Sequence, residues 1–348
     1  MTKVSKIIIA VIIAISIVFI WLMSSYHDAL EKKLNIPNGG LEYSIKAGSS
    51  LSAVLYQLAN KKIIENPRYL LWYARLNGLS NKMKTGDYHL SRTLTVQQFL
   101  DNIFTGKVVQ YSLTIIEGWS FQQLLNALNQ HPQIKHTLPQ LSNDDIMSKL
   151  NLPDVHPEGQ FLPDTYHFPK QLSDVDFLKR AYNAMQVTLQ SQWESRAVGL
   201  DYNNAYEALI MASIIEKETG LASEREQIAG VFVRRLEKKM RLQTDPTVIY
   251  GMGDKFKGNL RKRDLRQDTA YNTYRRHGLP PTPIALPGKE AIFAALHPAE
   301  GDALYFVARG DGSHVFSSTL KEHNNAVIKY QLKGRARSFS SYKHKNKE

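Results

Sequence analysis

The 348-residue sequence predicts an α+β protein with a single N-terminal transmembrane helix, a small module and a larger domain. Three observations support this architecture: a long apolar run near the N-terminus, a strand–helix–helix–strand pattern over residues 43–90, and helices mixed with short strands up to residue 332. The length accommodates two domains, and a hydrophobic fraction of 43% is ordinary for a chain that buries a core.

The apolar run Ile7–Met23 has Ser16 as its only polar residue, and its length is at the short end of what spans a bilayer. Lys3 and Lys6 precede the run, and Trp21 marks its far end. Cytoplasmic flanks of membrane spans carry an excess of Lys and Arg. We therefore expect a single-pass protein of the cytoplasmic (inner) membrane, with its N-terminus in the cytoplasm and the bulk of the chain on the periplasmic or outer side.

A cleaved signal peptide is the competing interpretation of this run. Signal peptides usually have a shorter apolar region, and no convincing A-x-A cleavage site stands before Tyr26, so an uncleaved anchor is preferred. The expected segments are a cytoplasmic N-terminus (1–6), a transmembrane helix (7–23), a linker (24–41), a small module (42–107), a larger domain (108–332) and a basic, disordered tail (333–348).

The formal net charge of +12 suits an anionic partner: nucleic acid, a membrane surface or a polymer with free carboxylates. The anchor places the basic surface outside the cytoplasm, so nucleic acid is not expected. The chain has no cysteine, which excludes disulfides, thiolate zinc sites and cysteine nucleophiles. It also lacks HExxH, Gly-rich phosphate-loop and G-x-S-x-G motifs, so we expect neither a catalytic metal nor a cofactor.

The small module is expected to begin with a strand at Tyr43–Lys46 and to contain a second strand at Gly86–Leu90. Between them, Ser49 or Ser50 can cap one helix and Pro67 opens a second. This order, with the phrase YSIKAGSSLSAVLYQLA, resembles a LysM-type module, a family that binds N-acetylglucosamine-containing glycans. A spacer domain with an ordinary core is the alternative.

Residues 93–197 are expected to alternate between helices, strands and loops. We expect helices at Thr93–Thr105, after Ser120 and at Val175–Ala197, a strand at Val108–Ile116, and a loop-rich zone over 129–157. The phrase EGQFLPDTY at Glu158–Tyr166 predicts a rigid, irregular loop that either lines a cavity or makes a turn.

The stretch that begins at Ala205 is apolar nearly all round, which predicts a helix inside a core. Glu216 and Glu218 follow directly, and Gly220 is a natural left-handed stop. Both glutamates share a face with apolar side chains, so both carboxyls could be desolvated, as a general acid near neutral pH requires. From periodicity alone, two solvated glutamates at a helix end are the more common outcome.

A second helix is expected up to Met240, starting where Ser223 and Glu226 have the spacing of a capping box. Residues 241–251 are polar and then strand-like, and the proline density of Gly278–Gly288 predicts an extended wall. The domain is completed by a short helix, a hairpin and a last helix, at Ile292–Ala295, Ala303–Phe316 and around His323.

Several phrases of this domain stand in a characteristic order: EGQFLPDTY at 158–166, EKET at 216–219, SERE at 223–226, RLQTDPTVIYG at 241–251, YNTY at 271–274 and GLPPTPIALPG at 278–288. Together with the N-terminal anchor they resemble the YceG-like family, from the anchor to about Leu332. Characterised members of that family are membrane-anchored endolytic murein transglycosylases.

The resemblance implies a lyase that cleaves MurNAc–GlcNAc bonds within the glycan strands of peptidoglycan and leaves 1,6-anhydro-N-acetylmuramic ends. It also implies that the second glutamate of EKET, Glu218, is the catalytic residue. Our own hypothesis for Glu216 is a supporting position behind Glu218 or an orienting hydrogen-bond acceptor. A partner peptidoglycan synthase and a role in terminating or trimming nascent strands are expected from the resemblance alone. Candidates for the sugar-binding walls are Gln243, Asp245, Tyr271, Asn272 and Tyr274.

One carboxyl is sufficient for such a reaction, because the C6 hydroxyl of muramic acid is already tethered to the ring that it attacks. The same carboxyl can protonate the leaving oxygen and later take the proton of the hydroxyl. Two alternatives stay open. A two-carboxylate muramidase would use Glu218 as acid and Asp245 or Glu226 as base, and a non-catalytic scaffold would bind peptidoglycan without shortening its strands.

Overall fold

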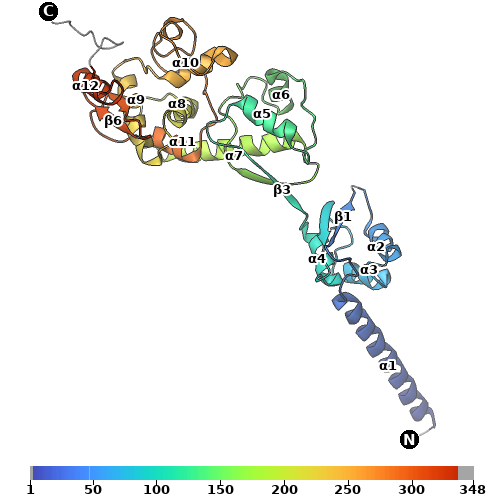
Figure 1. Cartoon of the computed structure of the whole chain (residues 1–348). Coiled ribbons are helices and arrows are strands. Elements are labelled where there is room, and N and C mark those ends of the chain that lie inside the picture. The colour runs from blue at the N-terminus through green and yellow to red at the C-terminus, as the bar shows by residue number, and fades with distance from the viewer. Residues whose placement is uncertain (1–2, 47, 336–348) are drawn as a thin grey trace, which may run out of the picture. The chain divides into compact units, whose positions relative to one another are not determined.

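The computed structural model describes residues 3–46 and 48–335, and it combines helices with short strands, as an α+β chain should (Figure 1). The chain divides into two compact units. Unit 1 consists of Met1–Tyr111 with His167–Gln171, and unit 2 of Ser112–Tyr166 with Leu172–Glu348. The strands of the described residues form three two-stranded sheets, β1–β2, β3–β4 and β5–β6. The expected tail from residue 336 onward lies outside the described residues.

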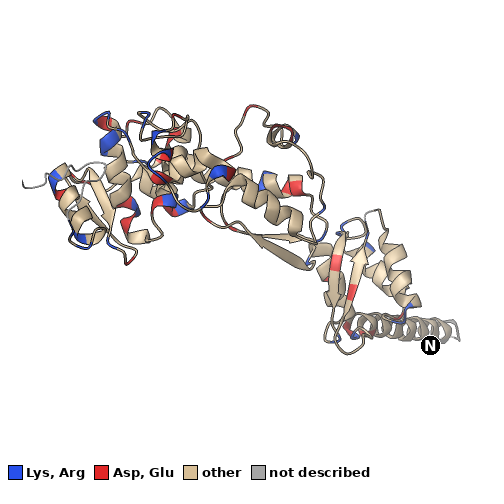
Figure 2. Ribbon diagram, turned by 45° about the horizontal axis from the view of Figure 1, so that its top comes forward, with Lys and Arg blue, Asp and Glu red and all other residues tan. Residues whose placement is uncertain are grey.

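Unit 1 starts with the long helix α1 (Lys3–Glu31). Within the described chain, α1 is the helix that is long and apolar enough to cross a membrane, and its apolar side chains are exposed. Figure 2 shows no charged residue along the middle of α1. These features match the expected single transmembrane helix.

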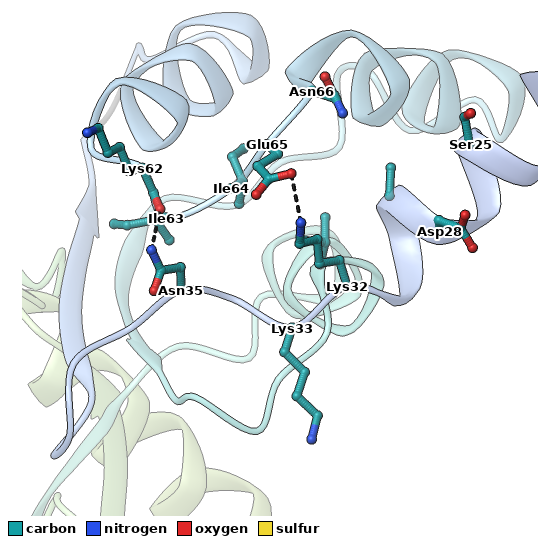
Figure 3. Close-up of a pocket in the computed structure, with 12 residues that line it drawn as sticks. Ser25, Asp28, Lys32, Lys33, Asn35, Lys62, Ile63, Ile64, Glu65 and Asn66 are labelled. Atoms are coloured by element: carbon teal, nitrogen blue, oxygen red, sulfur yellow. Dashed lines mark hydrogen bonds and ion pairs between the residues drawn. The ribbon is translucent and has the colours of Figure 1, made fainter.

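Residues 24–41 are part of unit 1, although their polarity predicted a linker. Helix α1 continues to Glu31, and Leu30, Leu34 and Ile36 are all at most 5% exposed. Polar contacts hold the same segment: Lys32 Nζ pairs with Glu65 at 2.8 Å, as Figure 3 shows. The segment is ordered because its few apolar side chains are spaced so that they enter the core of the unit.

The rest of unit 1 has the expected strand–helix–helix–strand order: β1 (Leu41–Ile45), α2 (Leu51–Asn60), α3 (Pro67–Leu76) and β2 (Gly86–Leu90), followed by α4 (Val96–Thr105). Strands β1 and β2 pair antiparallel, with Tyr43 opposite Tyr88. Ser50 caps α2 by accepting a hydrogen bond from the Ala53 amide at 3.1 Å. The apolar faces of the three helices pack on this sheet and form one core.

The remaining elements are β3 (Gln110–Thr114), α5 (Phe121–Gln130), α6 (Asn143–Lys149), β4 (Thr165–Pro169), α7 (Asp174–Glu194), α8 (Ala205–Glu218), α9 (Arg225–Glu237), α10 (Asp245–Met252), α11 (Lys289–Leu296), β5 (Tyr305–Ala308), β6 (His314–Ser317) and α12 (Leu320–Tyr330). Helix α8 is the centre of unit 2: it packs against α7, α9, α10 and α11. Every residue from Ala208 to Ile215 is buried, which confirms the predicted core helix.

Three local expectations for unit 2 are wrong. Residues 245–252 form helix α10 rather than a strand, because Thr244 is an extended N-cap and Pro246 suits the first turn. Ser223 does not cap a helix, since it lies inside a 3₁₀ turn (Ala222–Glu224). The last residue of α8 is Glu218, and the C-cap that follows it, Thr219, is extended. Gly220 is therefore not the left-handed stop of the helix. The expected loop-rich zone over 129–157 contains one short helix, α6.

Candidate active site

A cleft of about 530 Å³ opens in unit 2 at the C-terminal end of α8. Its lining comes from the end of α8, the segment before α10, the β5–β6 hairpin and α12. The cleft brings together four of the residues that the sequence singled out, although they are far apart in the chain: Glu218, Gln243, Asp245 and Tyr274.

Glu218 is the last residue of α8, and Thr244 donates a hydrogen bond from its hydroxyl to the Glu218 carboxylate. Burial raises the pKa of Glu218 to about 7, and the nearby charge of Asp245 adds to that rise. The Thr244 hydrogen bond and the charges of His314 and Arg235 act in the opposite direction. A carboxyl with a pKa near neutrality can both give and accept a proton at physiological pH.

Thr244 is held so firmly that its hydroxyl has a defined direction. The residue is 2% exposed, and its amide donates to Thr273 Oγ1 at 3.1 Å. The Thr247 hydroxyl donates to the Thr244 carbonyl at 2.8 Å and lies 2.9 Å from Thr273 Oγ1. These three buried threonines orient the group that binds Glu218. Sequence reasoning missed them, because each reads separately as an ordinary loop or helix-start residue.

Asp245 and Tyr274 form a hydrogen-bonded pair on the cleft wall. The Tyr274 hydroxyl donates to Asp245 Oδ1 at 2.6 Å. Burial and the carboxylates of Asp245 and Glu218 raise the pKa of Tyr274, so its phenol stays neutral. The neighbouring Gln243 has a left-handed backbone with φ of 54°, and its amide donates to the Thr273 carbonyl at 3.2 Å. Asp245 and Tyr274 therefore present a carboxylate and a neutral phenol to the cleft.

Arg235 of α9 is a second residue that the sequence did not reveal as part of the site. Its guanidinium is buried and donates to the carbonyls of Leu304 at 2.6 Å and Leu242 at 2.8 Å. It also lies 5.1 Å from the centre of the Tyr305 ring. Arg235 thus ties the segment before Thr244 to the start of the hairpin, and it places a positive charge near Glu218.

His314, at the start of β6 in the hairpin, also lines the cleft. His314 Nδ1 lies 2.7 Å from Glu224 Oε2, and the His314 amide donates to Glu224 Oε1 at 2.9 Å. Both side chains are largely buried, at 11% and 12% exposure. Glu224 therefore fixes the position of the imidazole and holds the hairpin against the turn before α9.

Glu216 does not line this cleft. Its carboxylate accepts a hydrogen bond from the Gly288 amide at 3.0 Å and lies 3.7 Å from the Arg225 guanidinium. The Glu216 side chain is only 6% exposed, and burial raises its pKa. Glu216 therefore connects the end of α8 to the start of α11, away from the carboxyl of Glu218.

Two other predicted wall residues, Tyr271 and Asn272, form hydrogen bonds with neighbouring segments of the protein. Asn272 is 1% exposed, and its side-chain amide donates to the carbonyls of Gln267 at 2.6 Å and Leu265 at 3.1 Å. Tyr271 bonds with Thr282 through their hydroxyls at 2.8 Å. Neither Tyr271, which is half-buried, nor the buried Asn272 lines the cleft around Glu218. An alternating polar and aromatic sequence cannot show which of its side chains turn inward.

Glu158, in the irregular loop EGQFLPDTY, is a second carboxyl with a perturbed pKa. It is 5% exposed; its carboxylate accepts hydrogen bonds from the Phe121 amide at 2.9 Å and from the Tyr250 hydroxyl at 3.2 Å. Burial raises the pKa of Glu158 to about 7. The loop therefore joins the start of α5 to α10.

The structure also bears on other candidate groups. Glu226 is exposed on α9 and does not line the cleft, whereas Asp245 does. In the described part of the chain, no group of three or more His, Asp or Glu side chains is arranged to hold a metal ion. The chemistry available in the cleft is thus proton transfer by carboxyls, supported by hydroxyl, imidazole and guanidinium groups.

Comparisons with known proteins agree on one family. The family model described as the YceG-like family matches residues 43–329. An endolytic murein transglycosylase of Bacillus subtilis (strain 168) is 33% identical over 308 residues, covering 82% of this chain and 84% of that protein. One of Streptococcus pneumoniae serotype 2 is 24% identical over 356 residues, covering 90% of this chain and 64% of its own.

A crystal structure of a yceG-like protein from Listeria monocytogenes has the same fold. The two chains superpose with a TM-score of 0.53 and are 32% identical. The match covers 83% of this chain and 99% of the Listeria chain.

Proposed function

Because the chain belongs to the YceG-like family, we propose that it is an endolytic peptidoglycan lytic transglycosylase in which Glu218 is the general acid and base. The observation that carries this proposal is the position of Glu218: its carboxyl lies in a cleft and burial raises its pKa to about 7. Relatives named endolytic murein transglycosylase support the substrate and the reaction type.

The proposed reaction begins with Glu218 protonated. Glu218 donates its proton to the glycosidic oxygen as the bond from muramic C1 to that oxygen breaks. The C6 hydroxyl of the same sugar then attacks C1, and the Glu218 carboxylate takes the hydroxyl proton, so the residue returns to its starting state. The negative charge of Asp245 lies on the same cleft, where it stabilises positive charge that develops on the sugar ring.

We also propose roles for the neighbours of Glu218. Thr244 and its two threonine partners hold the carboxyl in place, while Gln243, Asp245 and Tyr274 contact the sugars. Helix α1 anchors the chain in the cytoplasmic membrane with unit 2 on the outer side, as the flanking lysines favour. The proposal extends to three further points. The small module contacts glycan, a peptidoglycan synthase is a partner, and the cleavage terminates or trims nascent strands.

The decisive experiment compares two glutamates of one motif. The full chain in detergent is incubated with purified peptidoglycan, and the products are identified by mass spectrometry. We expect anhydro-muramic ends from the wild type, fewer of them from Glu216→Gln, and none from Glu218→Gln. Full turnover by Glu218→Gln would remove Glu218 from its proposed role.

A hydrolase is the second candidate function, because Asp245 places another carboxylate on the same cleft. Water would then replace the C6 hydroxyl as nucleophile, and the products would carry reducing ends instead of anhydro ends. The same mass spectra distinguish the two reactions. Intact strands with both the wild type and the variant would instead favour a binding scaffold.

A further inference from the structure

Helix α3 of unit 1 leaves a large apolar face exposed. Its core side is formed by Leu70 and Ala74, which are fully buried. Trp72 is 49% exposed and Leu76 is 79% exposed, and these two residues lie four positions apart on one face of the helix. Tyr69 extends the same face and meets the Trp72 ring edge-on, with ring centres 6.2 Å apart. Exposed aromatic and aliphatic side chains that gather on one helix face are typical of a surface that contacts a partner or a membrane.

The position of α3 beside α1 identifies that partner. The two helices pack against each other, and the start of α3 at Asn66 lines the same hollow of about 250 Å³ as Ser25 and Asp28 (Figure 3). Counted from Ile7, a bilayer core takes up roughly 20 helical residues, so α1 leaves the hydrocarbon close to Ser25. In Figure 1, α3 lies at the end of unit 1 from which α1 emerges.

The charges around this face fit a bilayer surface. Arg68 and Arg75 are exposed on α3, and because they are seven positions apart they lie together along one edge of the apolar face. Arginine side chains in such positions reach the phosphate groups of lipids, while Trp, Tyr and Leu enter the layer between headgroups and acyl chains. The helix that carries this face also contacts α1, whose own apolar side chains are exposed.

We propose that the exposed face of α3, formed by Tyr69, Trp72 and Leu76, lies in the interfacial layer of the lipid bilayer that α1 crosses. Unit 1 would then touch the membrane at two places: the end of α1 and the side of α3. Two contacts fix the orientation of the unit, whereas a single helix leaves it free to tilt. The proposal rests on the membrane placement of α1 and does not depend on the reaction that unit 2 catalyses.

The absence of cysteine makes a direct test practical, because single-cysteine variants can be labelled without background. Leu76→Cys and, separately, Trp72→Cys are made in the full chain, labelled with a nitroxide and reconstituted into liposomes of phosphatidylethanolamine and phosphatidylglycerol. Spin relaxation is measured with oxygen, which concentrates in lipid, and with a water-soluble nickel chelate. Two reference sites are Ile12→Cys on α1 and Ser44→Cys on the exposed side of β1.

We expect the labels at positions 72 and 76 to give a ratio of oxygen to nickel relaxation several-fold above that at Ser44 and below that at Ile12, as an interfacial depth requires. Labels at 72 and 76 that match Ser44 in liposomes would overturn the proposal. Strong nickel relaxation at Ile12 would overturn its premise as well, because α1 would then not be in lipid. All readouts are independent of glycan cleavage.

Discussion

The proton affinity of Glu218 results from opposing influences on one carboxyl. Burial and the charge of Asp245 favour the protonated acid, and the Thr244 hydrogen bond and the charges of His314 and Arg235 favour the carboxylate. The balance, a pKa of about 7, suits a residue that acts as acid in one step and as base in the next. Glu216, two residues earlier on the same helix, has the same chemistry but faces the Gly288 amide instead of the cleft.

Removing the Thr244 hydroxyl should therefore change the pH dependence of the reaction. In Thr244→Val the carboxylate of Glu218 loses a hydrogen-bond donor, which raises its pKa and moves the alkaline limb of kcat/KM to higher pH. We also expect kcat to fall by about tenfold or more, because the carboxyl is no longer held in one orientation. Rates of anhydro-muramic release are measured against pH. Thr244→Ser keeps the hydroxyl and should keep the wild-type limb; an unmoved limb in the valine variant would contradict the role of Thr244.

At the scale of elements, the site depends on how loops attach to α8. The segment that ends in Tyr274 returns to the cleft only because Asn272 holds the turn that precedes it. The Asn272 amide donates to two carbonyls of that turn, and its side-chain oxygen accepts a hydrogen bond from the Tyr274 amide at 2.9 Å. One buried side chain thus joins a basic surface loop to the cleft wall.

Asn272→Ala should loosen this loop while leaving the core of unit 2 folded. Loss of a buried amide with three good hydrogen bonds costs about 1–3 kcal/mol locally, which is enough to open the loop but not the domain. We expect faster tryptic cleavage within residues 255–266, where exposed lysines and arginines are frequent, and a raised KM. Asn259→Ala, at an exposed position of the same loop, is the control. Equal cleavage rates in the two variants would mean that Asn272 does not hold the loop.

At the scale of the whole molecule, three buried carboxyls of unit 2 link folding to pH. Burial raises the pKa of Glu158 and of Glu218 to about 7, and burial also raises the pKa of Glu216. The folded chain therefore binds more protons than the unfolded chain between the ordinary glutamate value of 4.5 and about 7. Since the slope of stability with pH follows this difference, the stability of unit 2 should fall as pH rises through that window.

Glu158→Gln isolates one of these contributions, because the amide keeps the size of the side chain and carries no charge. The shift in the pKa of Glu158 corresponds to about 3 kcal/mol, present below the ordinary glutamate value and lost as pH approaches 7. We expect the variant to lose less unfolding free energy than the wild type between these limits, measured by urea denaturation at a series of pH values. Glu226→Gln, which removes an exposed carboxyl from the same unit, should leave the profile unchanged. Parallel profiles for Glu158→Gln and the wild type would disprove the linkage.

Several features follow from local patterns along the chain. An apolar run without charge predicts α1, since a span requires only length and hydropathy. Apolar residues on all sides predict the buried helix α8, and Ser50 caps the helix that it was expected to cap. These predictions succeeded because the governing interactions lie within one element and its immediate neighbours. The ordered motifs also indicated the family, which the matches to known proteins establish.

The partners of Glu218 in the cleft depend on tertiary structure. Thr244 is 26 residues away from Glu218 in the sequence but hydrogen-bonds to it. Arg235 donates to the carbonyls of Leu242 and Leu304, which belong to two separate segments. Periodicity equally permits Glu216 to face the cleft, but packing against Gly288 turns it away. The sequence by itself determined the long apolar N-terminal helix, the core helix and the family; tertiary packing decided which carboxyl meets the cleft and what surrounds it. The physical reason is that a carboxyl's proton affinity depends on burial and nearby charges, which segments distant in sequence supply only after folding.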